Sequence, residues 1–246
     1  MIAKIQTKAG QLRFTVLNDL EAYRAESLFT KEPETTTWIE TFNDGDVFYD
    51  VGANVGVYSL YAALLYPRSS VFSFEPFHRN YGHLVENILE NQLANVNPVN
   101  VALSESTGLT TLFVPDTRFG ASGGQIGEPV NERGERFEAL AAVPTLCFRL
   151  DDLRQSAGLP FPHHVKIDVD GLEAAIIAGM SSFLFEPTLR SVLVEVNSEE
   201  DAEIIDAVLG EHGFSRDAEI GQLPQHSRHR RKLTPGNIAE NVVFRR

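Results

Sequence analysis

The sequence predicts an α/β fold built on a mostly parallel sheet with helices on both of its faces. From residue 47 onward, short β-branched and aromatic runs alternate with segments of helical spacing, which is the βαβ pattern of a parallel sheet. The first of these runs ends in a glycine turn. A later run, Ser191–Val196, is apolar almost throughout, as expected of a strand that is covered on both faces.

The first 45 residues precede this alternating pattern. Their predicted elements are a strand pair within residues 1–20, around a turn at Gly10, and helices over Leu20–Phe29 and Glu34–Phe42. We therefore expect residues 1–45 to form a small N-terminal extension of strands and helices. Residues 46–246 are then expected to form one compact α/β domain.

The predicted elements of this domain follow in chain order. The first half has strands at Val47–Tyr49, Val71–Phe74 and Val96–Leu103, with helices at Asn54–Tyr66 and Phe77–Asn91. The second half has strands at Val165–Val169, Ser191–Val196, Phe214–Glu219 and Ile238–Phe244, with helices at Leu172–Gly179 and Glu199–His212. Between the halves, a strand at Leu109–Val114 leads into glycine-rich Pro115–Val130. That segment is either a binding loop over a site or a flexible hairpin.

The composition narrows the range of partners. The chain has 246 residues with 21 basic and 34 acidic side chains, a net charge of -13, so it repels phosphate backbones and nucleic acid is not expected. The basic run at residues 228–232 is predicted to be a solvated loop. The single Cys147 allows no internal disulfide, and no apolar run resembles a signal peptide or a membrane span. We expect a cytoplasmic protein away from membranes, and a homo-oligomer remains open.

The first candidate site is the turn from Asp50 to Gly56. Small residues at Gly52, Asn54 and Gly56 let the backbone approach a ligand where a strand ends. The spacing is G-x-x-x-G, which differs from the G-x-G-x-x-G of dinucleotide sites, and no Walker lysine follows it. A pyrophosphate cradle is therefore not indicated. Asp50 would repel a phosphate but suits an ammonium group.

The second candidate is Glu75, which closes the next predicted strand. An acidic residue about 20 positions past the glycine turn can accept hydrogen bonds from both ribose hydroxyls. A glycine turn without phosphate-binding features, followed by a ribose carboxylate, describes a site for adenosine without pyrophosphate. S-adenosylmethionine fits that description.

The third candidate is the run from Val165 to Glu173, where a strand meets a helix. Lys166 lies inside an apolar strand, and a buried lysine needs an acidic partner. Asp168 is expected to project from the carboxyl end of the strand. Asp170 and Glu173 either serve the same site or stabilise the start of the helix.

Other polar residues are placed by the predicted strand ends. Glu195 and Asn197 end a strand at the rim where a substrate would lie, so a buried acid there is a binding candidate. We expect His163 and His164 at the edge of the sheet far from the site. His78 and His83 are expected on the surface. No spacing of His or Cys suggests a metal site, although the carboxylates could bind a metal.

Several ordered blocks resemble the FkbM family of methyltransferases. Phe48–Ser59 is similar to the first motif of that family and Phe74–Pro76 to the second. Later blocks also resemble it, at Asn100–Ser104, Leu150–Leu153 and Val165–Glu173, and Lys31–Thr35 with Trp38-Ile39 resembles a subset of the family. The resemblance extends from about residue 28 to residue 197.

This resemblance implies a class I methyltransferase fold, which is Rossmann-like, with a seven-stranded sheet and one antiparallel strand. It implies S-adenosylmethionine as the donor, S-adenosylhomocysteine as the product and most often a hydroxyl group as the acceptor. By the same resemblance, the expected contacts are Asp50, Gly52, Asn54 and Gly56 with the methionine part, Glu75 with the ribose, and Asn100, Val101 and Ala102 with the adenine. Asp168 is expected near the transferred methyl group. The family usually has Glu where this chain has Asp170.

The working hypothesis is therefore O-methylation of a small molecule, a sugar or a natural-product intermediate. Asp168 would orient or deprotonate the acceptor hydroxyl, and Lys166 or a histidine would assist it. Two alternatives stay open at this point. One is a nicotinamide-dependent oxidoreductase, and the other is a non-catalytic nucleotide-binding module on the same fold.

Overall fold

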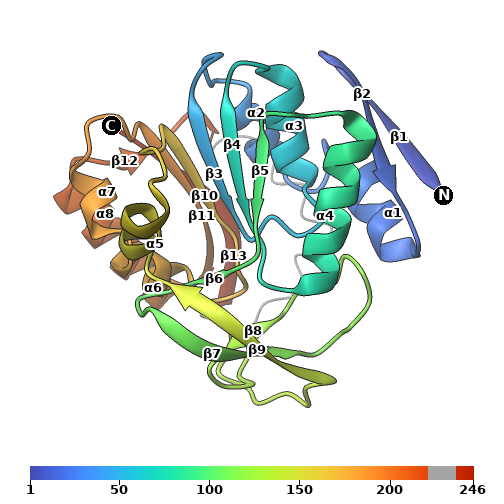
Figure 1. The fold of residues 1–246 in the computed structure, drawn as a ribbon. Helices are drawn as coiled ribbons and strands as arrows, with labels where there is room; N and C mark the ends of the chain where they lie inside the picture. The colour runs from blue at the N-terminus through green and yellow to red at the C-terminus, as the bar shows by residue number, and fades with distance from the viewer. Residues whose placement is uncertain (221–236) are drawn as a thin grey trace.

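The central feature of the molecule is a seven-stranded sheet, seen in a computed structural model that describes residues 1–220 and 237–246 (Figure 1). Its strands are β3 (Val47–Val51), β4 (Ser70–Phe74), β5 (Val96–Val99), β10 (His164–Ile167), β11 (Ser191–Ser198), β12 (Ser215–Arg216) and β13 (Asn237–Arg245). They lie in the order β12-β13-β11-β10-β3-β4-β5. Within the part of the chain described, β13 is the one strand that runs opposite to the other six. The predicted sheet is confirmed.

Helices cover both faces of this sheet (Figure 1). One face carries α2 (Pro33–Ile39), α3 (Val57–Leu65) and α4 (His78–Asn91), and the other carries α5 (Leu150–Ala157), α6 (Glu173–Ala178), α7 (Ser181–Phe185) and α8 (Glu199–Glu211). Successive side chains of a strand point to opposite faces, so Leu193 lies in one core while Val192 and Val194 lie in the other. This explains why Ser191–Val196 is apolar almost throughout.

The first residues form a hairpin and a helix that pack on the α3 and α4 side. The hairpin is β1 (Ile2–Thr7) with β2 (Gly10–Thr15), and α1 (Asp19–Glu26) follows with Asn18 as its cap. Two asparagine carbonyls of α4 accept backbone N–H groups of β2: Asn87 from Thr15, and Asn91 from Arg13, both at 2.8 Å. Leu12 and Phe14 of the hairpin also lie in the apolar core between the sheet and these helices. The boundary at residue 45 stays a prediction.

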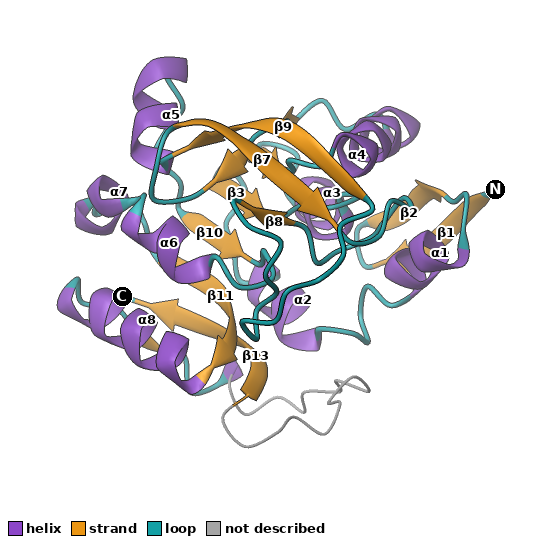
Figure 2. Cartoon of the chain, turned by 90° about the horizontal axis from the view of Figure 1, so that it is seen from below, coloured by secondary structure: helices purple, strands orange, loops and turns teal. Residues whose placement is uncertain are grey.

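A second, four-stranded sheet lies across the carboxyl ends of the first (Figure 2). It contains β6 (Ala102–Leu103), β7 (Gly108–Val114), β8 (Gln125–Ile126) and β9 (Ala141–Phe148). A single strand over Val96–Leu103 is therefore wrong, because the chain leaves the first sheet after Val99 and pairs with β9 from Ala102. The Asn100 side chain holds this turn by donating to the carbonyl of Glu75 at 2.7 Å. Strand β9 and helices α5 and α7 were not predicted.

Two further expectations change. The helix expected from Asn54 begins only at Val57, because Asn54 and Gly56 have left-handed backbone angles, φ of 52° and 88°, that end the turn before the helix. His83 is not on the surface: it is buried, pairs with Glu21 of α1 and stacks on Phe119. The basic run 228–232 lies outside the described residues.

A chain of buried polar groups joins the amino ends of the central strands. The Trp38 indole N–H donates to Ser191 Oγ at 2.8 Å, which lies 2.8 Å from His164 Nδ1. His164 Nε2 lies 3.0 Å from Asp46, which also accepts from Arg190 at 2.6 Å. Because the ionised Asp46 carboxylate can only accept, the proton of a neutral His164 is on Nε2, and the Ser191 hydroxyl donates to the bare Nδ1.

This Ser191–His164–Asp46 arrangement has the order of a nucleophilic triad but not its accessibility. Ser191 is fully buried, so no substrate can reach its oxygen. Burial lowers the pKa of His164 to about 4, against the opposing effect of Asp46. His164 is therefore a neutral structural bridge between Ser191 and the ionised Asp46, at the edge opposite the carboxyl ends.

We expect this histidine to make the fold acid-sensitive. Its pKa is about 4 in the folded chain and near its ordinary 6.5 in the unfolded chain, so the unfolded state binds the extra proton between these values. The free energy of unfolding should fall by about 2 kcal/mol between pH 7 and pH 5 from this group. Urea titrations of wild type and His164→Gln, compared at the two pH values, measure that difference. His78→Gln, at an exposed position, should keep the full pH dependence.

Candidate functional site

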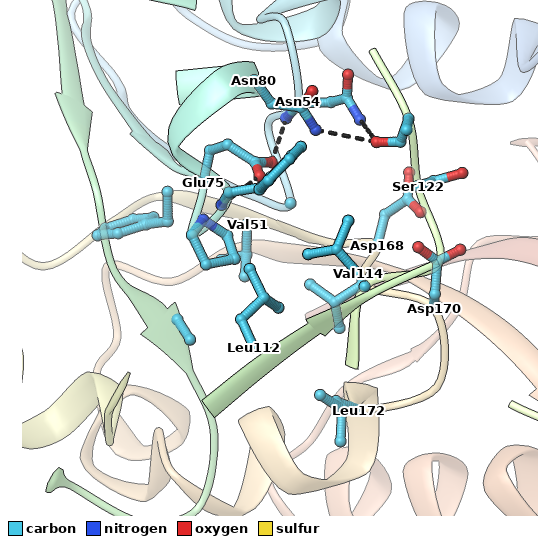
Figure 3. A pocket seen from close by; sticks show the side chains of 18 of the residues that line it. Val51, Asn54, Glu75, Asn80, Leu112, Val114, Ser122, Asp168, Asp170 and Leu172 are labelled. Carbon is cyan, nitrogen blue, oxygen red and sulfur yellow. Dashed lines mark hydrogen bonds between the residues drawn. The ribbon is translucent and has the colours of Figure 1, made fainter. Parts of the chain in front are cut away.

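A cavity of about 270 Å³ opens at the carboxyl ends of β3, β4, β10 and β11 (Figure 3). Val51, Glu75, Asp168 and Glu195 line it from the central sheet. Leu112 and other apolar side chains of the second sheet face them, so the cavity lies between the two sheets. This is the edge where ligands bind in open α/β folds.

The glycine turn forms one wall of this cavity. Gly52 has φ of +80°, and a Cβ at this position would overlap the carbonyl oxygen of Asp168. Only glycine allows the ends of β3 and β10 to come so close. Gly52 and Asn54 line the cavity. Gly56 is not among the residues that line it and instead precedes α3, where a Cβ would overlap Leu84.

Asp50 lies inside β3 and is almost completely buried. Its Oδ2 accepts from Ser59 Oγ at 2.5 Å, and its Oδ1 lies 3.8 Å from Lys166 Nζ. Burial raises the pKa of Asp50, although Lys166 opposes this shift. Asp50 does not appear among the lining residues, so here it serves as a partner of the buried lysine beneath the cavity floor.

Glu75 follows the end of β4, and its carboxylate is held by two backbone N–H groups. Its Oε2 accepts from Asn54 at 2.9 Å, and its Oε1 accepts from Phe77 at 2.9 Å (Figure 3). Burial raises the pKa of Glu75 to about 7 despite these hydrogen bonds. The Glu75 carboxyl group is therefore held in a fixed orientation at the cavity, and it gains or loses its proton near neutral pH.

The turn after β5 contributes an apolar part of the lining. Val101 and Ala102 line the cavity beside Leu103. Asn100 does not appear among the lining residues; its amide instead donates to the carbonyls of Glu75 and Pro76 at 2.7 and 3.1 Å. Asn100 thus orders the turn that presents its two neighbours.

Lys166 and Asp168 form the charged centre of the site. Lys166 is almost fully buried, and its Nζ donates to Asp168 Oδ2 at 2.7 Å. Burial alone would raise the pKa of Asp168, but the charges of Lys166 and Lys31 outweigh it and hold the pKa below its usual value. Asp168 lines the cavity, while Lys166 lines a smaller adjoining space beside Tyr58. An ionised carboxylate therefore faces the ligand space.

Asp170 and Glu173 bind backbone N–H groups outside the helix. Asp170 Oδ2 accepts from the Gly123 N–H at 2.6 Å, and the Glu173 carboxylate accepts from Val169 and Gly171. Neither side chain caps α6, whose cap position is Leu172 and has no side-chain hydrogen bond. Asp170 instead tethers the glycine-rich loop to the site.

That glycine-rich loop is part of the cavity wall. Asn54 and Asn80 each donate to the carbonyl of Ala121 at 2.9 Å, and Asn80 also accepts from Gly120 (Figure 3). Ala121, Ser122 and Gly124 line the cavity. Hydrogen bonds from Asn54 of the predicted turn and Asn80 of α4 therefore hold the loop in place against the cavity.

Two cations from the N-terminal segment were missed as site residues. Arg24 and Lys31 line both the cavity and the smaller space beside it. Lys31 belongs to a block with a family resemblance, so a signal was present for it. Arg24 has no such signal, because only the packing of α1 against the loop brings it to the site. Where the structure describes the chain, no cluster of three or more His, Cys, Asp or Glu side chains could hold a metal.

Comparison with known proteins assigns the family. Residues 50–216 match the methyltransferase FkbM domain model, which is more than half of the chain. The chain belongs to the FkbM methyltransferase family. It is 28% identical over 216 residues to the hexuronic acid methyltransferase AglP of Haloferax volcanii, covering 87% of this chain and 82% of that relative. It is 30% identical over 207 residues to the 31-O-demethyl-FK506 methyltransferase FkbM of Streptomyces tacrolimicus, covering 73% of this chain and 76% of that relative.

Among solved structures, a precorrin-6y C5,15-methyltransferase from Geobacter metallireducens aligns with a TM-score of 0.46 at 16% identity, covering 94% of this chain and 90% of that chain. As a member of this family, the chain is a methyltransferase, and the oxidoreductase alternative is not supported. Across the described ranges, no helix is long and apolar enough to cross a membrane.

The family implies S-adenosylmethionine, and the cavity residues fit it. Gly52 leaves the space that a Cβ would fill, so the backbone can approach a ligand closely. Glu75 offers a carboxylate for ribose hydroxyls, and Val101 and Ala102 offer an apolar surface for a base.

We expect Gly52→Ala to destabilise the fold and weaken binding of S-adenosylhomocysteine. The variant combines an unfavourable positive φ with overlap at the Asp168 carbonyl, and should lose about 2 kcal/mol more stability than Gly213→Ala. Gly213 has the similar φ of +82° but open space around its Cβ position. Thermal unfolding and calorimetric titration measure both effects. Equal losses in the two variants would contradict the close approach.

Proposed function

We propose that this protein transfers the methyl group of S-adenosylmethionine to a hydroxyl group of a small molecule, namely a sugar or a natural-product intermediate. The observation that carries the proposal is the ionised Asp168, held by buried Lys166 at the end of β10 and lining a cavity shared with Glu75 and Gly52. The relatives named as acting on hexuronic acid and on 31-O-demethyl-FK506 support this class of acceptor.

The chain's own residues would divide the cavity into a cofactor part and an acceptor part. Gly52 and Asn54 would line the methionine part, Glu75 would accept from the ribose, and Val101 with Ala102 would pack against the adenine. Asp50, Gly56 and Asn100 would support these contacts from outside the lining.

In the acceptor part of the cavity, charged side chains would position the acceptor for methyl transfer. When bound, S-adenosylmethionine supplies a methyl group that is already activated for displacement. The protein's remaining task is to align the acceptor oxygen and to keep its hydrogen bonding favourable for attack. Asp168 is suited to this task because Lys166 keeps it ionised, so it can accept a hydrogen bond from the acceptor hydroxyl.

A methyl-transfer assay over a panel of acceptors tests the proposal. The panel contains methyl glycosides of neutral hexoses and of hexuronic acids, macrolide alcohols, and amines of matched size. Formation of S-adenosylhomocysteine and of a methyl ether with a hydroxylated acceptor supports the proposal. Methylation of amines alone would contradict it.

We expect Asp168→Asn to lower kcat by about 100-fold or more while changing the affinity for S-adenosylhomocysteine by less than about threefold. The amide keeps the shape of the side chain but loses the charge that Lys166 stabilises. Steady-state kinetics and calorimetry separate the two effects. Asp151→Asn, at a carboxylate outside the cavity lining, is the control for kcat. Near-normal turnover by Asp168→Asn would refute the assigned role.

We expect the affinity for S-adenosylhomocysteine to fall below neutral pH because of Glu75. An ionised carboxylate accepts from both ribose hydroxyls, and the pKa of Glu75 is about 7 in the free chain. The Kd should therefore rise roughly eightfold between pH 7.5 and pH 6.0. Glu75→Gln should bind more weakly and without this dependence. Glu86→Gln, at an exposed position of α4, should retain it.

A further inference from the structure

Glu195 is a second carboxyl group of the cavity, next to Asp168. Strands β10 and β11 pair in parallel with Ile167 opposite Val194, so Asp168, which directly follows β10, and Glu195, which lies inside β11, occupy neighbouring positions. Both line the cavity, together with Asp170. Glu195 therefore shares the ligand space in which the acceptor would lie.

The two carboxyl groups differ in their hydrogen-bond partners. Asp168 Oδ2 accepts from Lys166 at 2.7 Å. Within the described parts of the chain, the one donor to Glu195 is the Asn197 amide, which reaches Oε2 at 3.3 Å. No basic side chain there forms an ion pair with Glu195. Its Oε1 is thus left to accept a proton from a ligand.

The charges around the two carboxyl groups also differ: Asp168 lies near cations, whereas Glu195 lies near other acidic side chains. Burial raises the pKa of Glu195 well above its usual value, and the negative charges of Asp168, Asp170, Glu173 and Glu32 add to this shift. The cations of this region, Lys166, Lys31 and Arg24, act on Asp168 and hold its pKa low. The other titratable groups on the elements around Glu195 are Glu34 of α2 and Glu240 of β13, while Asn241 lies opposite Glu195 across the strand pair.

A pair of carboxyl groups with separated pKa values can divide two tasks. The weaker base stays charged and orients, while the stronger base accepts a proton. Asp168 has the position and the cation for the first task. Glu195 suits the second task, because its Oε1 has no donor and no basic side chain pairs with it within the described residues.

We propose that Glu195 is the general base that takes the proton of the acceptor hydroxyl, while Asp168 orients that hydroxyl without being protonated. This inference rests on the proposed function. The acceptor O–H bond breaks as its proton moves to the Glu195 carboxylate, and an oxygen electron pair forms the new O–CH₃ bond. The S–CH₃ bond breaks with its electron pair going to sulfur, which gives S-adenosylhomocysteine. The proton on Glu195 then passes to solvent.

The first test uses the hydroxylated acceptor of the panel that wild type methylates fastest. We expect kcat of wild type to rise with pH as Glu195 loses its proton. Glu195→Gln should lower kcat by about 100-fold or more, leave KM for S-adenosylmethionine within about threefold, and abolish that rise. Glu195→Asp should restore part of kcat and the pH dependence. Asp168→Asn should be slow but keep the pH dependence. Glu203→Gln, exposed on α8, should behave as wild type.

Unchanged kcat and pH profile in Glu195→Gln would overturn the inference while leaving the proposed function in place. Methylation of no hydroxylated acceptor by wild type would instead overturn the proposed function.

The second test needs no acceptor. The glutamate carboxyl groups are labelled with ¹³C, and their NMR resonances are titrated with and without S-adenosylhomocysteine. The resonance of Glu195 is identified by its absence from the spectrum of Glu195→Gln. We expect it to titrate well above the usual range for glutamate. The spectrum of the control variant Glu203→Gln should still contain the Glu195 resonance. Titration of the Glu195 resonance at or below the usual glutamate value would overturn the inference, because a carboxylate of that kind is too weak a base.

Discussion

The buried ammonium group of Lys166 is the constraint on which the site depends. A lysine enclosed in a sheet must be paired, because removing an unpaired charge from water is strongly unfavourable. Its partners are Asp168 at 2.7 Å on its own strand and Asp50 at 3.8 Å on the neighbouring strand. The pairing aligns β10 with β3 and leaves Asp168 ionised where the strands end. One buried charge thus connects the register of the sheet with the electrostatics of the cavity.

The two edges of the sheet have different physical roles. At the amino edge, Trp38, Ser191 and His164 form a closed, neutral network that no ligand can reach. At the carboxyl edge, Asp168 and Glu195 line a cavity and are not fully satisfied by protein partners. At the amino edge the polar groups satisfy one another's hydrogen bonds and stabilise the fold. Chemistry is possible where they retain free capacity for a ligand.

Much of the site could be predicted because its residues follow local patterns. Gly52, Asn54, Glu75 and Asp168 each stand where an apolar strand stops, and a strand's carboxyl end is readable from its own residues. The same reasoning could not separate residues that line the cavity from those that support it. Asp50, whose side chain points to its partners on β10 and α3, is one of the supports.

Local residue patterns were enough to predict the α/β class, the alternation of strands and helices, and a glycine turn without the features of a pyrophosphate site. Each of these depends on short-range periodicity and on residue type. Three features became visible only in the folded chain. The chain crosses into a second sheet after Val99, Arg24 and Lys31 join the cavity, and Lys166 pairs with Asp168 while Glu195 lacks a cation. These outcomes depend on which distant segments become neighbours, and long-range packing sets that without leaving a local pattern.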